Sequence, residues 1–215
     1  TLTTHNHQAQ TINDSKLEKL PGKTHSFTAT VKDEFPELSY PNAMELTLKA
    51  GAQVMFVKND LSGDKLFFNG KIGKVKSFDG DIIVVKCPDD ESSIRVERVE
   101  WQNVKFTINE ETKEIEESVI GTFTQYPLKL AWAITIHKSQ GLTFDRAVID
   151  ACDAFAHGQV YVALSRCRTL EGLVLSSHIN RRSFIDNPVL SGFVNGSLQI
   201  QPDRNQLSES KKAYQ

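Results

Sequence analysis

The sequence predicts an α/β protein in which a parallel sheet with covering helices is interrupted by a small β-barrel. Strand-like and helix-like apolar segments alternate near both ends of the chain, which is typical of a parallel sheet covered by helices. Between them, over residues 43–123, several short strand-like segments are separated by turns, as in small barrels. The two patterns together predict one sheet that is split by an insertion.

The first elements are a short strand over residues 2–6 and a helix over residues 7–20 with an apolar side. Residues 26–31 alternate like a strand, and residues 35–42, which contain two prolines, predict a linker. A Gly-Lys-Thr triplet at Gly22 resembles the end of a phosphate-binding loop. It follows a helix and precedes a strand, which is the reverse of what that loop requires, so we interpret Gly22 as a helix stop.

The middle of the chain predicts strands and turns only. The strand-like segments are residues 44–48, 53–57, 72–75, 82–85, 94–99, 104–108 and 119–123. Asn69-Gly70 is a strong turn signal, for which we expect positive φ at both residues. The acidic residues between 110 and 117 predict a solvated turn.

The second α/β segment begins near Gln125. Pro127 suits a first helical position, and the apolar residues from 128 to 136 predict a helix. Residues 147–149 and 172–175 predict buried strands on either side of a helix over residues 158–166. In such sheets ligands bind where loops leave the strand ends, which would place Lys138, Gln140 and Arg166 at one rim.

Two polar segments of this region have a specific resemblance. TIHKSQGLTFD (residues 135–145) resembles helicase motif V, and GQVYVALSRCR (residues 158–168) resembles motif VI. The likeness is to superfamily 1B DNA helicases of the RecD and PIF type, which move 5′ to 3′ on single-stranded DNA; Thr143 resembles this branch, where the UvrD-like branch usually has Glu. Thr4-His5-Asn6 resembles motif IV in position, although Thr and Asn are equally suited to cap a helix.

The resemblance implies a domain organisation. LTLKAGAQVMFVKND (residues 46–60) and FFNGKIGKV (residues 67–75) resemble the SH3-like domain 2B that is inserted in the second RecA-like domain, 2A, of these helicases. We therefore expect domain 2A over residues 1–42 and 124–215, with 2B over residues 43–123. The polar sequence beyond Gly196 predicts a terminal helix or a link to a further domain.

The resemblance also implies roles for individual residues. Arg166 would be the arginine finger, the catalytic residue that stabilises charge on the γ-phosphate, unless it pairs with an acidic neighbour such as Asp145. The ATP-binding residues would be Gln140, Gly141 and Arg166. The DNA-binding residues would be Thr4, His5, Asn6, Thr135, His137, Lys138 and Ser139. Hydroxyl groups and lysines suit phosphate oxygens, and histidine suits a phosphate or a base, without any reading of sequence.

The motifs of a first RecA-like domain, including Walker A and Walker B, are not recognised in the sequence. We therefore expect a C-terminal piece of a longer helicase that is inactive alone. ATP and Mg²⁺ would be bound mainly by the N-terminal RecA-like domain of the same protein, and the partners would be that domain and single-stranded DNA. Two alternatives remain open: a non-enzymatic single-stranded DNA-binding module that uses the barrel, and a RecD-like subunit of an exonuclease complex.

Composition agrees with these expectations. The net charge is −2, from 25 Lys and Arg against 27 Asp and Glu, so any path for phosphates has to be local. Cys87, Cys152 and Cys167 have no CxxC spacing, which indicates reduced thiols and no metal site, so we expect a cytoplasmic protein. No apolar run approaches the length of a membrane span, and we expect no membrane partner.

Overall fold

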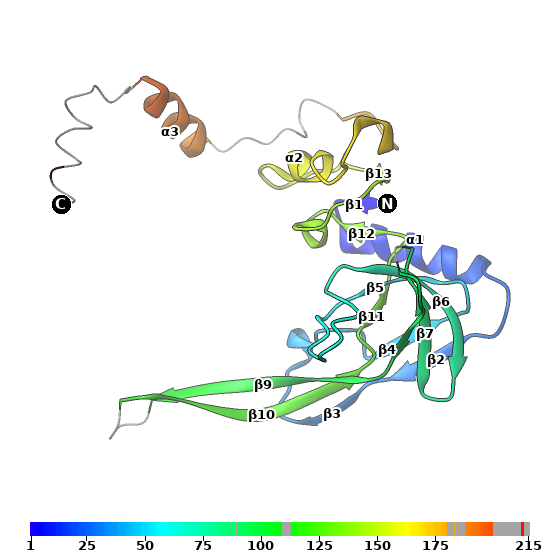
Figure 1. The fold of residues 1–215 in the computed structure, drawn as a ribbon. Coiled ribbons are helices and arrows are strands. Elements are labelled where there is room, and N and C mark those ends of the chain that lie inside the picture. The colour runs from blue at the N-terminus through cyan, green and yellow to red at the C-terminus, as the bar shows by residue number, and fades with distance from the viewer. Residues whose placement is uncertain (89, 109–112, 180–182, 184–187, 200–211, 213–215) are drawn as a thin grey trace.

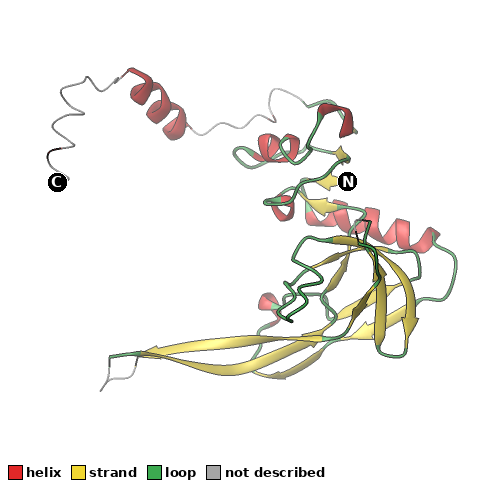
Figure 2. Cartoon of the chain, in the orientation of Figure 1, coloured by secondary structure: helices red, strands yellow, loops and turns green. Residues whose placement is uncertain are grey.

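A computed structural model describes residues 1–88, 90–108, 113–179, 183, 188–199 and 212 (Figure 2). A four-stranded parallel sheet and three antiparallel sheets make up a mixed α/β fold, as the sequence predicts. The parallel part consists of the parallel sheet with its helices α1 and α2. The antiparallel part consists of strands β2 to β11 (Figure 1).

The parallel sheet has the strand order β12-β1-β13-β14. Its strands are β1 (Leu2–Thr3), β12 (Ile134–Thr135), β13 (Ala147–Ile149) and β14 (Leu173–Leu175). The first strand of the chain lies in the middle, where Leu2 pairs with Ile134 on one side and with Ile149 on the other. The segments at the two ends of the chain therefore form one sheet, as expected from the alternating pattern.

Helix α1 (Asn6–Lys19) follows β1, and α2 (Gln159–Leu164) lies between β13 and β14. The buried residues of α1 are Ala9, Asn13 and Leu17, which recur at helical spacing. Helix α1 ends at Lys19, and Leu20 is already extended with a ψ of +134°, so Gly22, with a φ of +99°, lies in the connection to β2 and does not itself stop the helix. The described structure also contains α3 (Pro188–Gln199) and a 3₁₀ turn, η3 (Leu170–Gly172).

The antiparallel part contains a five-stranded sheet β11-β5-β6-β7-β8, a three-stranded sheet β3-β10-β9 and the pair β2-β4. The bounds are β2 (His25–Thr28), β3 (Thr30–Asp33), η1 (Glu37–Ser39), β4 (Glu45–Leu48), β5 (Gln53–Phe56), β6 (Ile72–Asp79), β7 (Ile82–Lys86), β8 (Ile94–Val96), β9 (Val99–Ile108), β10 (Ile115–Gln125) and β11 (Leu128–Leu130). Strands β9 and β10 form a long hairpin that projects from the rest (Figure 1). The acidic segment predicted as a turn lies partly outside the described residues; Glu116 and Glu117 belong to β10.

The predicted helix over residues 128–136 is wrong. The segment forms β11 and β12, and Leu128 pairs with Phe56 while Leu130 pairs with Val54. A short apolar run satisfies both the helical and the strand periodicity, and pairing with β5 decides between them. Pro127 is compatible with this outcome because proline is tolerated just before a strand begins.

The turn at Asn69-Gly70 is present, but it differs from the expected geometry. It lies in the loop between β5 and β6, and Gly70 alone of the two has positive φ, at +100°. A Cβ atom at Gly70 would lie 2.1 Å from the Leu142 Cδ2 atom. Glycine is therefore favoured here for two reasons: the backbone has positive φ, and the Leu142 side chain comes too close for a Cβ atom.

Two apolar cores meet at strand β5. Val54 and Phe56 belong to the core of the antiparallel part, whereas Met55 belongs to the core beneath the parallel sheet. This division follows from the alternation of side chains along a strand. The division of the chain after residues 42 and 123 stays a prediction, and β2, β3 and β11 pair with strands from across it.

Candidate functional site

The carboxyl ends of three parallel strands place three loops at one edge of the sheet. Strand β1 ends at Thr3, β12 at Thr135 and β13 at Ile149. Because neighbouring strands are parallel, the chain leaves all three at the same edge. Segments that are more than 130 residues apart in the sequence thereby become neighbours. We call the edge of the sheet at which Thr3, Thr135 and Ile149 end their strands the carboxyl edge.

After β1 the chain turns directly into α1. Thr4 is buried, and its hydroxyl lies 3.0 Å from Gln8 Oε1 and 2.8 Å from His5 Nδ1. The His5 backbone N–H donates to the same Gln8 oxygen at 3.2 Å. The Thr4 hydroxyl thus holds the turn together, whereas Asn6, the first residue of α1, is exposed. No acidic residue lies in the first turn of α1, which leaves the positive end of its dipole uncompensated there.

After β12 the chain forms a 3₁₀ turn, η2 (His137–Ser139). Ser139 is fully buried, and its hydroxyl donates to the Ile136 carbonyl at 2.7 Å. His137 and Lys138 are exposed, so they are the two side chains of this turn that face solvent. The contacts to DNA that the sequence suggests for Ser139 and Thr4 stay predictions, because in this structure both hydroxyls bond within their own turns.

A cluster of rings lies at the carboxyl edge and joins all three loops. The Phe155 ring lies 4.8 Å from the His5 ring and 6.0 Å from the His137 ring, centroid to centroid, and it is 56% exposed. Gln159 of α2 holds the Phe155 loop, because its Oε1 accepts the Phe155 backbone N–H at 3.0 Å. Sequence analysis missed Phe155; the available signal was a ring in a polar loop directly after a strand.

Gln140 and Gly141 follow the 3₁₀ turn and are exposed. Gly141 has a φ of +80°, a conformation that favours glycine, and a Cβ atom there would meet nothing within 4 Å. The backbone at Gly141 is therefore open to solvent, and a ligand can approach it closely.

The Arg166 guanidinium is held by neutral groups. Its Nε donates to the Val162 carbonyl at 3.0 Å, its Nη1 to the Leu142 carbonyl at 3.2 Å and its Nη2 to the Ser165 hydroxyl at 3.0 Å. The alternative pairing of Arg166 with Asp145 is wrong, because Arg168 pairs with Asp145, at 3.1 Å. Within the described residues no carboxylate neutralises Arg166, so its charge is available to an anionic ligand.

The described residues contain no group of three or more His, Cys, Asp or Glu side chains that could hold a metal ion. Cys87, Cys152 and Cys167 form no disulfide bonds. No described helix is both long and apolar enough to cross a membrane.

Comparisons with known proteins agree with this geometry. Residues 130–174, which include η2 and Arg166, match the family of UvrD-like helicase C-terminal domains. The rat ATP-dependent DNA helicase PIF1 is 39% identical over 183 residues, an alignment that covers 80% of this chain and 26% of the rat protein. The chain thus spans about a quarter of that relative.

Two solved structures of Pif1 from Bacteroides are similar in both sequence and fold. The complex with ADP-AlF4 has a TM-score of 0.78 and 40% identity, covering 92% of this chain and 44% of that one. The complex with single-stranded DNA has a TM-score of 0.74 and 40% identity, covering 91% of this chain and 44% of that one.

The split parallel sheet, the two motifs at its edge and the matched family model are those of the C-terminal region of superfamily 1B helicases. Within that class, the chain corresponds in sequence and fold to the C-terminal region of Pif1-family helicases. The predicted resemblance to the RecD and PIF type is confirmed.

Proposed function

We propose that this chain is the DNA-gripping and phosphate-sensing part of an ATP-dependent helicase that moves 5′ to 3′ on DNA. The observation that carries the proposal is the ring cluster of His5, His137 and Phe155 beside Lys138 at the carboxyl edge, in which His137 and Phe155 are exposed and His5 is partly buried. Aromatic stacking combined with a nearby cation is how sequence-tolerant proteins hold single-stranded DNA. The similar Pif1 structure from Bacteroides was solved in complex with single-stranded DNA, which supports the same partner.

The proposed contacts divide by exposure. Asn6, His137 and Lys138 face solvent and would contact phosphates or bases, and His5 and Phe155 would stack on a base. The buried residues Thr4, Thr135 and Ser139 would act mainly by holding the turns in place. Contacts to phosphates and stacking on base faces carry no sequence information, which suits a motor that must pass every sequence.

The nucleotide would lie against Gln140, Gly141 and Arg166, between this chain and an N-terminal RecA-like domain. The open Gly141 backbone and the uncompensated Arg166 charge fit a triphosphate. Arg166 would stabilise the charge that develops on the γ-phosphate during phosphoryl transfer. Mg²⁺ and most contacts to ATP would come from the N-terminal domain, so the chain alone is expected to hydrolyse no ATP.

Binding of this chain to a fluorescently labelled oligo(dT) tests the proposed grip. We expect Phe155→Ala to weaken binding by about tenfold, because stacking contributes about 1–3 kcal/mol per base. His137→Ala is expected to act in the same direction. Tyr161→Ala is a matched control, since Tyr161 lies on α2 with 73% of its side chain exposed, outside the ring cluster.

If the Phe155→Ala and His137→Ala variants bind oligo(dT) as tightly as the Tyr161→Ala control does, the proposed grip is contradicted. A second assay addresses catalysis, because turnover of ATP by the purified chain, stimulated by single-stranded DNA, would contradict the assignment of the phosphate cradle to another domain.

A single-stranded DNA-binding module that works through the antiparallel part is a second candidate. It is favoured by the rings of His25 and Phe78, which stack with centroids 3.9 Å apart, and by Phe106, which is 66% exposed on the long hairpin. In that case Phe106→Ala or Phe78→Ala, and not Phe155→Ala, would weaken binding to oligo(dT).

A further inference from the structure

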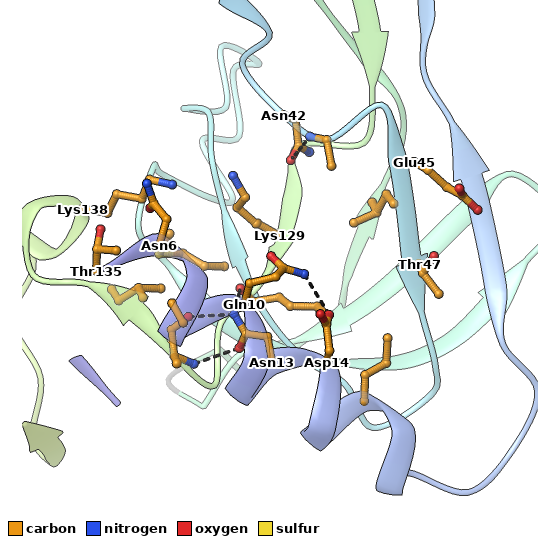
Figure 3. A pocket seen from close by; sticks show the side chains of 18 residues that line it. Asn6, Gln10, Asn13, Asp14, Asn42, Glu45, Thr47, Lys129, Thr135 and Lys138 are labelled. Atoms are coloured by element: carbon orange, nitrogen blue, oxygen red, sulfur yellow. Dashed lines mark hydrogen bonds between the residues drawn. The ribbon is translucent and has the colours of Figure 1, made fainter. Parts of the chain in front are cut away.

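A cavity of about 290 Å³ opens between α1, residues 42–47 and residues 129–138 (Figure 3). Two buried asparagines fix its walls. The Asn13 side chain of α1 donates to the Ala133 carbonyl at 2.8 Å and accepts the Ala133 N–H at 2.9 Å. The Asn42 side chain donates to the carbonyls of Tyr126 and Leu128, both at 2.9 Å. The cavity is therefore held open by hydrogen bonds within the fold.

The polar groups of the cavity are separated by charge. Lys129, Lys138 and Asn6 gather at one end, while Asp14 and Glu45 lie toward the other (Figure 3). The Asp14 carboxylate already accepts a hydrogen bond from Gln10 Nε2 at 2.8 Å. Among the described residues, no carboxylate forms an ion pair with Lys129 or Lys138.

The half-buried Lys129 ammonium group lies beside the exposed Lys138 ammonium group, and two like charges without an anion between them are unfavourable. Burial in the cavity wall, and then the neighbouring Lys138 charge, lower the pKa of Lys129. The first turn of α1, which begins at Asn6, adds the positive end of a 14-residue helix and carries no acidic residue. All three features favour the binding of an anion at this end of the cavity.

We propose that the end of this cavity formed by Asn6, Lys129 and Lys138 binds a phosphate group of single-stranded DNA, with Lys129 as a DNA-binding residue outside the helicase motifs. The inference rests on the proposed function, because Asn6 and Lys138 also belong to the carboxyl edge and would carry the strand from the ring cluster to the cavity. Thr135, which lines the cavity, connects the two sites.

The test measures binding of oligo(dT) to this chain at several salt concentrations. Lys129→Met should weaken binding by about tenfold at low salt, because a hydrogen bond to a charged group is lost. It should also reduce the slope of log K against log salt by about 0.7, the value for one phosphate contact on a single strand. Lys129→Arg keeps the charge and should keep most of the slope.

Lys49→Met is the matched control. Lys49 is also half-buried, and it donates to the carbonyls of Glu18 and Leu20 near the other end of α1, about 20 Å away along the helix. It should leave affinity and slope unchanged. If the wild-type chain does not bind oligo(dT), the proposed function fails; if it binds through Phe155 while Lys129→Met changes neither affinity nor slope, only the cavity proposal is overturned.

Thermal stability distinguishes a binding role for Lys129 from a structural one. Because the pKa of Lys129 is lower in the folded protein than in the unfolded chain, its charge opposes folding at neutral pH. That opposition is complete below the folded pKa and disappears as pH rises from there to the unfolded pKa. Lys129→Met should therefore raise Tm at pH 7 while it weakens binding. A lower Tm that accompanies the weaker binding would contradict the proposal.

A free phosphate ion has the same chemistry as a phosphate group of DNA. Experiments with inorganic phosphate therefore distinguish these two ligands. A DNA site should bind oligo(dT) with a Lys129-dependent salt slope, and inorganic phosphate at the same phosphate concentration should raise Tm little. A Lys129-dependent rise in Tm with inorganic phosphate, together with an unchanged salt slope for oligo(dT), would overturn the assignment to DNA.

Discussion

The antiparallel part and the parallel part bury their apolar side chains to different degrees. In the antiparallel part, Phe56, Ile83 and Val85 are fully buried in one core. In the parallel part the strands have only two or three residues each, and Val174 and Leu175 of β14 are 55% and 45% exposed. The first part thus carries a well-packed core, whereas the second is a thin sheet whose main effect is to bring loops together.

This difference in burial predicts that stability depends mainly on the antiparallel part and that function depends mainly on the loops of the parallel part. Substitutions in the antiparallel core should cost folding free energy, because packing is dense there. Substitutions at the carboxyl edge should change binding or catalysis with little effect on folding, because the exposed side chains there make few internal contacts. The predictions below test this separation.

The largest expected effect is on catalysis. In a protein that also contains the nucleotide-binding N-terminal half, Arg166→Ala should reduce ATP hydrolysis by roughly 10³–10⁵, the contribution of such an arginine in related phosphoryl transfer. Steady-state ATPase assays measure it, and binding of oligo(dT) should be retained. Arg168→Ala is the control: Arg168 makes only an exposed pair with Asp145, so its loss should change little. Near-normal turnover of Arg166→Ala would contradict its role.

The next effect is on stability. Phe56→Ala removes a fully buried ring that stacks on Phe67 with centroids 4.4 Å apart. It should lower the free energy of unfolding by about 3–5 kcal/mol. Urea unfolding followed by fluorescence measures the loss. Phe106→Ala removes the same ring from a position that is 66% exposed and should change stability by less than about 0.5 kcal/mol. Similar losses for both would show that the core assignment is mistaken.

A smaller effect should couple the two parts. Gly70→Ala places a methyl group against Leu142 and strains a backbone with a φ of +100°, so we expect a loss of about 1–3 kcal/mol. Leu142→Ala should relieve the overlap, so the double variant should lose less than the sum of the two single variants. If the losses measured by urea unfolding are additive, the side chain at position 70 and Leu142 do not interact.

The smallest expected effect on stability is that of a substitution at Asn69, the residue before Gly70. Asn69 does not have positive φ, and its side chain is exposed, so Asn69→Ala should change the free energy of unfolding by less than about 0.5 kcal/mol. The same urea experiment measures it. A loss as large as that of Gly70→Ala would restore the expectation that both positions need positive φ.

Much of the fold could be predicted from local patterns. Strand β1, helix α1, strands β13 and β14 and helix α2 follow from apolar periodicity and from glycines at their ends. The segment from Leu128 to Ile136 could not be predicted, because its apolar residues fit a helix as well as a strand. Only pairing with Met55 and its neighbours in β5 makes β11 a strand.

The candidate site was predictable in part. The motifs indicate His137, Lys138 and Arg166 directly, because their polar residues stand among apolar ones. Phe155 and Lys129 lie outside the two motifs. Phe155 joins the site only where three loops meet, and Lys129 joins it only through the packing of α1. The buried positions of Thr4 and Ser139 likewise depend on hydrogen bonds that only the folded turn reveals.

The most direct test of the DNA grip is an NMR titration of the isotope-labelled chain with oligo(dT). We predict that the chemical shifts of Asn6, His137, Lys138 and Phe155 change with DNA concentration, that addition of salt reverses the changes, and that another oligonucleotide sequence gives the same pattern. Signals of the antiparallel part, such as those of Phe78 and Phe106, should stay in place. Changes concentrated at Phe78 and Phe106, with the carboxyl edge unaffected, would contradict the account.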